Sequence, residues 1–320
     1  MTRARAAAPV IATLTLNPAV DLSAVVDRLE PERKLRCHDL RRDPGGGGIN
    51  VARVIRRLGG QAVAAFVAGG VGGERLRALL ATERVPVAVV PTQAETRENF
   101  TAHDLATGQE YRFVMPGAPL RTAEQRSVMV LLKGLTPAPE ILVLSGSLPP
   151  DFPLAVHERL IRQARRAGVR LVLDASGQAL TAGLAAGVWL VKPNLRELED
   201  LCGRPLPDLA SRLAACREII AAGGAAMVAL SLGREGALLV TAERAWRARP
   251  LDIVPVSTIG AGDSFLAGLV WALGRGLAPP EALRWAVATA SATLLAPGTS
   301  LCRRADVLRL RRTVTVEAVG

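Results

Sequence analysis

Short apolar runs alternate along most of the chain with longer segments whose apolar residues recur at helical spacing. The short runs predict buried strands at residues 11–16, 62–68, 141–145, 170–174, 189–191 and 226–231. The longer segments predict helices at residues 49–58, 74–81, 155–167, 207–222, 261–273 and 280–295. Because strands that alternate with helices are typical of a largely parallel sheet covered on both faces, we expect an α/β fold.

Two regions, residues 22–44 and 96–116, interrupt this alternation. They lack helical periodicity and contain hairpin-like segments, for example on either side of the turn Ala106-Thr107-Gly108. We expect these segments to build a small second sheet, a lid over the carboxyl ends of the parallel strands. The predicted organisation is a single domain over residues 1–320 with lid strands inserted at about 20–44 and 96–118.

The composition limits the class of protein. Hydrophobic residues make up 49% of the 320 residues, which is enough for a sizeable core. No uninterrupted apolar stretch reaches the roughly 18 residues that span a bilayer, and the motifs begin almost at the N-terminus. We therefore expect a cytoplasmic protein without a membrane partner. The four cysteines form no CxxC pair and the three histidines no metal-ligand spacing, which indicates free thiols.

The chain is strongly basic, with a net charge of +11 that comes mainly from arginine, since lysine occurs only at positions 34, 133 and 192. Aromatic residues are only 3%, and no basic run is interleaved with aromatics as a base-stacking surface requires. We therefore expect no nucleic-acid partner. A cleft that attracts polyanionic substrates is the better interpretation of the charge.

Four consecutive residues, Gly260-Ala261-Gly262-Asp263, carry the clearest chemical signal. They follow an extended, β-branched run at residues 253–259 and begin a small-residue, apolar segment that predicts a buried helix. A helix N-terminus offers unpaired N–H groups and a partial positive charge, and glycine lets an anionic oxygen approach them. A carboxylate beside such an anion site suits phosphoryl transfer. Taken alone, the same four residues fit equally well a structural loop, in which Asp263 is an ordinary acidic residue in the first turn of a helix.

A glycine-rich loop at residues 44–53 also runs into a predicted helix. Its four glycines let the backbone approach a ligand, and Asn50 in the first helical turn can bond to sugar hydroxyls. A flexible turn is the alternative. The spacing matches neither the P-loop nor the dinucleotide-binding fingerprint.

Three further segments have both a structural and a functional interpretation. After Lys192-Pro193, Asn194 is placed to cap a helix and Glu197 to complete a capping box, but beside a phosphate the same Glu can order Mg²⁺-bound water. The turn at residues 231–236 can cradle a nucleotide. Arg97, in the expected lid, can clamp a phosphate.

Together these segments resemble the pfkB (ribokinase-like) carbohydrate kinases, and within them the phosphosugar branch. The resemblance extends over about residues 11–305 and is carried by residues 14–18, 34–37, 44–53, 110–118, 145–150, 192–194 and 257–264. It implies a three-layer sandwich with a mostly parallel central sheet and a small β-sheet lid. It also implies homodimers in which the lid sheets pack together.

The resemblance implies ATP- and Mg²⁺-dependent conversion of fructose 6-phosphate to fructose 1,6-bisphosphate. Asp263 would take the proton from the sugar's primary hydroxyl, and the N–H groups of Gly260, Ala261 and Gly262 would form the anion hole. The residues implied to hold the sugar and its phosphate are Asp21, Gly46, Gly47, Asn50, Ser147, Arg97 and Lys34. The residues implied to hold ATP are Lys192, Asn194, Ser231, Gly233 and Gly236. Glu197 is implied to organise Mg²⁺. A K⁺ ion is implied at Ser257, Ile259 and Gly298.

The chain departs from the family pattern at two positions. Ser300 stands where an Arg is expected, next to the residues implied to bind K⁺, and backbone oxygen ligands are not removed by that change. Phe265 stands where a Met is expected and is interpreted as a packing residue. Kinases acting on fructose 1-phosphate or tagatose 6-phosphate share every catalytic motif and remain alternatives. A non-catalytic sugar or nucleotide sensor is a more distant one, because a sensor needs no base at Asp263.

Overall fold

The computed structural model describes residues 10–320, which form two β-sheets and the helices that cover the larger one. The larger sheet has ten strands in the order β14-β13-β12-β11-β10-β9-β8-β1-β4-β5. Its strands are β1 (Val10–Thr15), β4 (Gln61–Ala68), β5 (Val87–Pro91), β8 (Ile141–Ser145), β9 (Arg170–Asp174), β10 (Val188–Val191), β11 (Ala225–Ser231), β12 (Ala237–Thr241), β13 (Ala245–Ala248) and β14 (Val316–Val319). Neighbours from β5 to β11 run parallel, and β12, β13 and β14 continue the sheet antiparallel.

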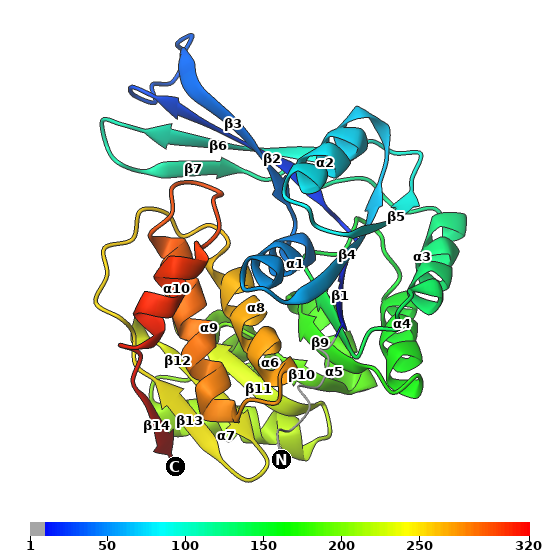
Figure 1. Cartoon of the computed structure of the whole chain (residues 1–320), viewed down its shortest axis with the longest axis vertical. Coiled ribbons are helices and arrows are strands. Elements are labelled where there is room, and N and C mark those ends of the chain that lie inside the picture. Colours follow the sequence, from blue (N-terminus) through cyan, green and yellow to red (C-terminus); the bar gives the residue numbers. More distant parts are fainter. Residues whose placement is uncertain (1–9) are drawn as a thin grey trace, which may run out of the picture.

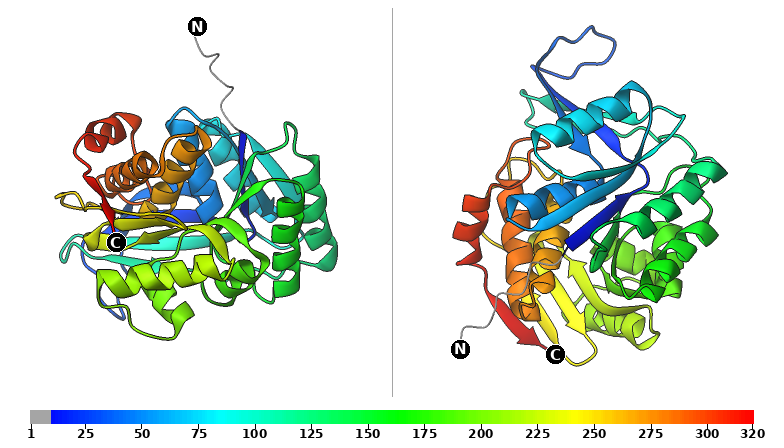
Figure 2. Two further views of the ribbon diagram at one scale, coloured as in Figure 1. Left: turned by 90° about the horizontal axis from the view of Figure 1, so that it is seen from below. Right: turned by 45° about the vertical axis from the view of Figure 1, so that its right-hand side comes forward.

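Helices cover both faces of this sheet, so the molecule has three layers (Figure 2). One face carries α1 (Gly47–Arg57), α2 (Gly70–Thr82), α8 (Ala261–Gly274), α9 (Pro279–Leu294) and α10 (Arg304–Arg311). The other carries α3 (Thr122–Gly134), α4 (Leu154–Arg166), α5 (Gly177–Ala186), α6 (Leu195–Cys202) and α7 (Leu209–Ala221). A separate apolar core fills each interface, and α8 is buried along most of its length. The expected α/β sandwich is confirmed.

The smaller sheet contains β3 (Cys37–Gly45), β2 (Ala19–Val26), β6 (Arg97–Asp104) and β7 (Glu110–Phe113), in the order β3-β2-β6-β7. It stands beyond one end of the larger sheet, and the β2–β3 hairpin projects outward from it (Figure 1). Strands β2 and β6 pair in parallel, which places Asp21 opposite both Asp43 and Asn99. The small second sheet expected from the two irregular regions is therefore present.

The β-branched run before the Gly260 turn belongs to neither sheet. Its amides at Val256 and Ser257 donate instead to the carbonyl of Leu294 at the end of α9, at 2.7 and 3.3 Å. Val254 is 85% exposed, so β-branching here does not mark a buried strand. The segment is an irregular connection that leads into α8.

The sequence also missed or shortened several elements. Helices α3, α5, α6 and α10 and strands β5, β12, β13 and β14 were not predicted as such, apart from the cap at Asn194. Helix α2 begins at Gly70, before its predicted start, because its glycines pack closely. A Cβ atom at Gly72 would lie 2.4 Å from the carbonyl oxygen of Thr96.

Within residues 10–320, none of the helices combines the length and apolarity that crossing a membrane requires.

Candidate active site

The N-terminus of α8 lies at the carboxyl ends of the parallel strands, facing the N-terminus of α1. Gly260 is the N-cap and adopts the left-handed conformation (φ 74°), which permits the sharp entry into the helix. No side chain caps this end. Apart from a long hydrogen bond of 3.4 Å from Ala261 N to the carbonyl of Thr258, the first N–H groups of α8 are therefore available to an anion.

Asp263 lies in the first turn of α8, and its Oδ2 accepts a hydrogen bond from Nδ2 of Asn50 at 2.9 Å. Burial raises the pKa of Asp263 to about 7, and the negative charge of Asp174 adds to this rise. The Asn50 hydrogen bond and the positive charges of Lys192 and Arg112 act in the opposite direction. A carboxylate poised near neutral pH is suited to general-base catalysis.

Asn50 is held in one orientation by Arg53, which is almost completely buried (1% exposed). Arg53 Nη1 donates to Oδ1 of Asn50 and to the carbonyl of Pro44, both at 3.0 Å. Its Nε donates to Oε1 of Glu83 at 3.0 Å. Because Oδ1 of Asn50 receives the guanidinium, its amide nitrogen is turned toward Asp263.

The glycine loop before α1 fits closely against the ends of β1 and β8. Ile49 N donates to Oγ1 of Thr15 at 3.1 Å, which fixes the first turn of α1 on β1. Gly46 has φ 113°, and a Cβ atom at Gly47 would lie 2.4 Å from Oγ of Ser145. Only glycine fits at both positions.

Polar residues of the smaller sheet line the adjoining side of the site. Asp21 is 5% exposed and accepts from Nδ2 of Asn99 at 2.7 Å, against the backbone of Gly45. Asn17 Nδ2 donates to Oγ of Ser147 at 3.2 Å and to the carbonyl of Pro116 at 3.1 Å. The predicted sugar residues Asp21 and Ser147 thus flank the turn that follows β1.

Arg97 is the first residue of β6, and its side chain reaches the segments that follow β1 and β7. Its Nη2 donates to the carbonyl of Asn17 at 2.9 Å and its Nη1 to the carbonyl of Met115, while its buried Nε has no partner among the described residues. Burial lowers the pKa of Arg97, the charge of Asp21 raises it, and the nearby charge of Arg112 lowers it further. A phosphate beside Arg97 and Arg112 would relieve their mutual repulsion.

Lys34 does not join these residues within one chain. It is exposed on the connection beyond the Val26–Cys37 pair, at the far end of the β2–β3 hairpin. Asp21 lies five residues before Val26 on β2, so at the usual rise per residue of a strand these two residues are roughly 17 Å apart. Within one chain, the structure therefore does not bring Lys34 to the other predicted sugar residues.

Lys192 follows β10 and lies beside the N-terminus of α8. Its Nζ is 3.0 Å from Oδ1 of Asp174, and a Cβ atom at Gly262 would lie 4.0 Å from the same nitrogen. Burial disfavours the charge of Lys192, yet the ion pair with Asp174 raises its pKa overall. The ammonium group stays charged next to the predicted anion hole.

The capping box predicted for α6 is present. Glu197 N donates to Oδ1 of Asn194, and Asn194 N donates to Oε2 of Glu197, both at 2.9 Å. Burial raises the pKa of Glu197 although the Asn194 N–H and the charge of Lys192 lower it. Ser231 is next to this cap, because its N–H donates to the carbonyl of Pro193 at 3.1 Å.

The turn that follows β11 uses glycine for geometric reasons. Gly233 and Gly236 have φ 56° and 95°. A Cβ atom at Gly236 would lie 2.1 Å from the carbonyl oxygen of Ala248, so this position cannot carry a side chain. Its place at the carboxyl end of β11 agrees with the predicted nucleotide turn.

The segments expected to hold K⁺ meet near the end of α9. Ser257 N donates to the carbonyl of Leu294, and Oγ of Ser257 accepts from Ile259 N, both at 3.3 Å. Gly298, in the connection after α9, has φ 54°. Hydroxyl and backbone oxygens are the ligands that a hard cation takes. Elsewhere in residues 10–320 no group of three or more His, Cys, Asp or Glu side chains could hold a metal ion.

Sequence reasoning missed four residues of the site: Asn17, Arg53, Arg112 and Asp174. All but Asp174 lie inside motifs that carried the resemblance, and their polar character within those motifs was the available signal. Asp174 ends a predicted strand, where a carboxylate at the carboxyl edge of a parallel sheet is a candidate ligand position.

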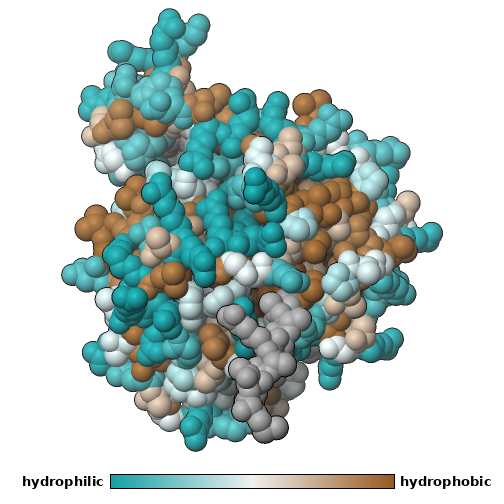
Figure 3. All heavy atoms as spheres, in the orientation of Figure 1, coloured by the Kyte–Doolittle hydropathy of each residue, from teal (hydrophilic) through white to brown (hydrophobic). Residues whose placement is uncertain are grey.

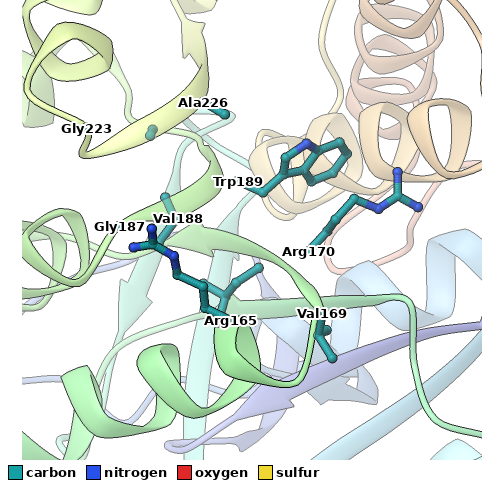
Figure 4. A pocket seen from close by; sticks show the side chains of 11 residues that line it. Arg165, Val169, Arg170, Gly187, Val188, Trp189, Gly223 and Ala226 are labelled. Carbon is teal, nitrogen blue, oxygen red and sulfur yellow. The ribbon is translucent and has the colours of Figure 1, made fainter.

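A separate hollow of about 400 Å³ lies at the amino-terminal ends of β9, β10 and β11, at the opposite end of the parallel strands from Asp263 (Figure 4). Its arginines have partners: Arg165 Nη1 donates to the carbonyl of Ala186 at 3.3 Å, and Arg170 stacks over Trp189 at 4.9 Å. It contains none of the residues around Asp263 and forms no part of the candidate site.

Comparison with known proteins agrees with this geometry. The chain is 44% identical over 301 residues to ATP-dependent 6-phosphofructokinase isozyme 2 of Escherichia coli, covering 94% of this chain and 97% of that protein. It is 39% identical over 266 residues to 1-phosphofructokinase of Xanthomonas campestris, covering 82% and 83% of the two chains.

The fold also matches a solved structure. The crystal structure of phosphofructokinase-2 from Escherichia coli in complex with fructose-6-phosphate superposes with a TM-score of 0.90 at 42% identity, covering 95% of this chain and 99% of that one. The model of the pfkB family carbohydrate kinases matches residues 9–306. The chain belongs to the pfkB family of carbohydrate kinases.

Proposed function

We propose that the chain is an ATP- and Mg²⁺-dependent 6-phosphofructokinase that transfers the γ-phosphoryl group in line to fructose 6-phosphate. The single observation that carries the proposal is the Asn50–Asp263 hydrogen bond at the uncapped N-terminus of α8. It places a base of raised pKa beside the N–H groups of the first turn of α8 and the charged Lys192. That arrangement meets the two needs of phosphoryl transfer, a proton acceptor and fixed positive charge.

In the proposed mechanism, Asp263 takes the proton from the primary hydroxyl as its oxygen attacks the γ-phosphorus. The N–H groups of Gly260, Ala261 and Gly262 stabilise the charge on the transferring phosphoryl oxygens, with Lys192 on the nucleotide side. Bound Mg²⁺ would supply further charge neutralisation. Glu197 fits a role toward it, because only Oε2 is engaged by the helix cap and Oε1 can accept from metal-bound water.

Substrate binding is assigned to the remaining residues. Asp21, Asn50, Ser147 and the backbone of Gly46 and Gly47 would hold the sugar hydroxyls. Arg97 and Arg112 would bind its phosphate, because the charge of Arg112 is close enough to Arg97 to lower its pKa. Asn194, Ser231, Gly233 and Gly236 would hold ATP. Ser257, Ile259 and Gly298 would provide the K⁺ site.

We further propose a cytoplasmic homodimer through the smaller sheets. Apolar side chains remain exposed on this sheet and directly after it, including Leu40 (55%), Phe113 (49%) and Met115 (44%). Figure 3 shows apolar residues among hydrophilic ones on the projecting part of the molecule. Lid pairing would cover them and bring the Lys34 connection of one chain to the site of its partner.

Asp263→Asn tests the central role most simply. We expect kcat to fall by about 10²- to 10⁴-fold, the usual contribution of a general base, with little change in ATP affinity. Asp252→Asn, an exposed acid in the preceding irregular segment, is the matched control and should be unaffected. Near-normal turnover of Asp263→Asn would contradict the assignment.

A further inference from the structure

Glu110 reaches from the smaller sheet to the segment that enters the catalytic turn. It is the first residue of β7, paired with His103 of β6. Its Oε2 accepts a hydrogen bond from Oγ of Ser257 at 3.2 Å, although the two residues are 147 positions apart. Ser257 is only 4% exposed, so this contact lies at a buried junction between the sheet and α8.

Ser257 connects this contact to the anion hole. A hydroxyl has one proton, and Glu110 as a carboxylate can only accept, so the proton of Ser257 is directed at Glu110. The lone pairs of Oγ are then free to accept from Ile259 N, at 3.3 Å. This bond orients the peptide between Thr258 and Ile259, one peptide before the one that joins Ile259 to Gly260.

A second contact of the same kind lies at the other edge of the smaller sheet. Asp43 of β3 accepts a hydrogen bond from Oγ1 of Thr299 in the connection after α9. Arg41 holds Asp43 in place, with Nε 2.7 Å from Oδ2 and Nη2 2.8 Å from Oδ1. The two edge strands, β3 and β7, thus each present a carboxylate to a hydroxyl, that of Thr299 after α9 and that of Ser257 before α8. Of the two, the Glu110 contact is the one that leads to Gly260.

We propose that Glu110 is a positioning residue, which couples the placement of the lid sheet on the sugar to the geometry of the anion hole through Ser257 and Ile259. The proposal rests on the proposed kinase function. When the lid is seated, Glu110 fixes the Ser257 hydroxyl and thereby the direction of the N–H groups at Gly260 and Ala261. Loss of the carboxylate lets the hydroxyl rotate and the catalytic turn relax.

The test compares Glu110→Ala, Glu110→Gln and Ser257→Ala. We expect Glu110→Ala to lower kcat about 5- to 10-fold, the worth of one hydrogen bond, with KM for ATP unchanged. Glu110→Gln keeps an acceptor oxygen and should recover most of this loss. The double variant Glu110→Ala/Ser257→Ala should be no worse than Ser257→Ala, because both act through one contact.

Gln109→Ala is the matched control, since this exposed neighbour contacts only the Tyr111 hydroxyl through its side chain and should leave kcat unchanged. Wild-type kcat in Glu110→Ala, no rescue by Gln, or additive effects with Ser257→Ala would overturn the proposal.

Amide hydrogen exchange at Ile259 gives a readout independent of the substrate. Faster exchange at Ile259 in Glu110→Ala than in Gln109→Ala supports the link, and equal exchange overturns it. Absence of ATP-dependent transfer to any sugar phosphate by the wild type would instead refute the proposed function, and the exchange comparison would still decide the role of Glu110.

Discussion

At the scale of single residues, the chemistry depends on how neighbours set the charge and direction of Asp263. Burial and the charge of Asp174 push its pKa up, while Asn50 and Lys192 hold it near neutrality. Arg53 acts on Asp263 indirectly, because its hydrogen bond to Asn50 turns the Asn50 amide group toward the carboxylate. Asn50 and Lys192 were predicted from local motifs. The contact of Asp174 with Lys192 was not, because it joins segments that no local pattern relates, and the contact of Arg53 with Asn50 was missed although both lie in the same motif.

The raised pKa predicts a pH dependence of kcat/KM. The base must be ionised, so activity should fall by about tenfold per pH unit below pH 7 and level off above it. Lys192→Met removes a charge that lowers the pKa of Asp263, so its midpoint should move to higher pH. Lys133→Met, an exposed lysine on α3, is the control and should leave the midpoint in place.

Because phosphomonoesters themselves titrate at about pH 6, the displacement between variants is the decisive quantity in this experiment. Equal midpoints for Lys192→Met and Lys133→Met would contradict the electrostatic account of Asp263.

At the scale of elements, the site depends on two helix N-termini, of α1 and α8, that meet over the ends of parallel strands. Both were predicted from the sequence, because a glycine turn precedes an amphipathic helix in α1 and a strongly apolar one in α8. It missed α3, where the unbroken apolar run at residues 128–132 hides the helical period and only Glu124 and Val128 are buried. The β-branched residues 253–259, expected to be extended, join no strand, and the amides of Val256 and Ser257 donate to the carbonyl of Leu294 at the end of α9.

The close fit of α1 on β8 predicts the effect of a single methyl group. Gly47→Ala would place a Cβ atom 2.4 Å from Ser145 Oγ and displace the loop that holds the sugar. We expect overpacking to lower kcat/KM for fructose 6-phosphate about 10- to 100-fold, which steady-state kinetics measures. Gly134→Ala, where no atom lies within 4 Å, is the control and should be neutral. Unchanged kinetics in Gly47→Ala would show that the loop is not constrained by β8.

At the scale of the whole molecule, the smaller sheet connects the sugar site to the molecular surface. Its presence was predictable from the break in helical periodicity. Its contacts with the body, Glu110 to Ser257 and Asp43 to Thr299, were not, because they form only when distant segments come together. The exposed position of Lys34 likewise became evident only with the hairpin in place.

The proposed lid-to-lid dimer predicts a linked loss of assembly and affinity. Leu40→Asp places a charge among the exposed apolar residues of the sheet, so sedimentation should show monomers. The KM for the phosphosugar should also rise, because Lys34 of one chain no longer reaches the site of its partner. Val130→Asp alters a residue that is equally apolar and 69% exposed, but on α3, and should change neither. A dimeric Leu40→Asp variant would place the interface elsewhere.

The most direct test of the central claim is a coupled ADP-release assay across a panel of sugars. The panel consists of fructose 6-phosphate, fructose 1-phosphate, tagatose 6-phosphate and unphosphorylated fructose, each measured with wild-type protein and with Asp263→Asn. The account predicts the highest kcat/KM for fructose 6-phosphate, the lowest for unphosphorylated fructose, and loss of turnover in Asp263→Asn for every sugar. A preference for another sugar phosphate would contradict the assigned substrate, and sugar-dependent ADP release that survives Asp263→Asn would contradict the mechanism.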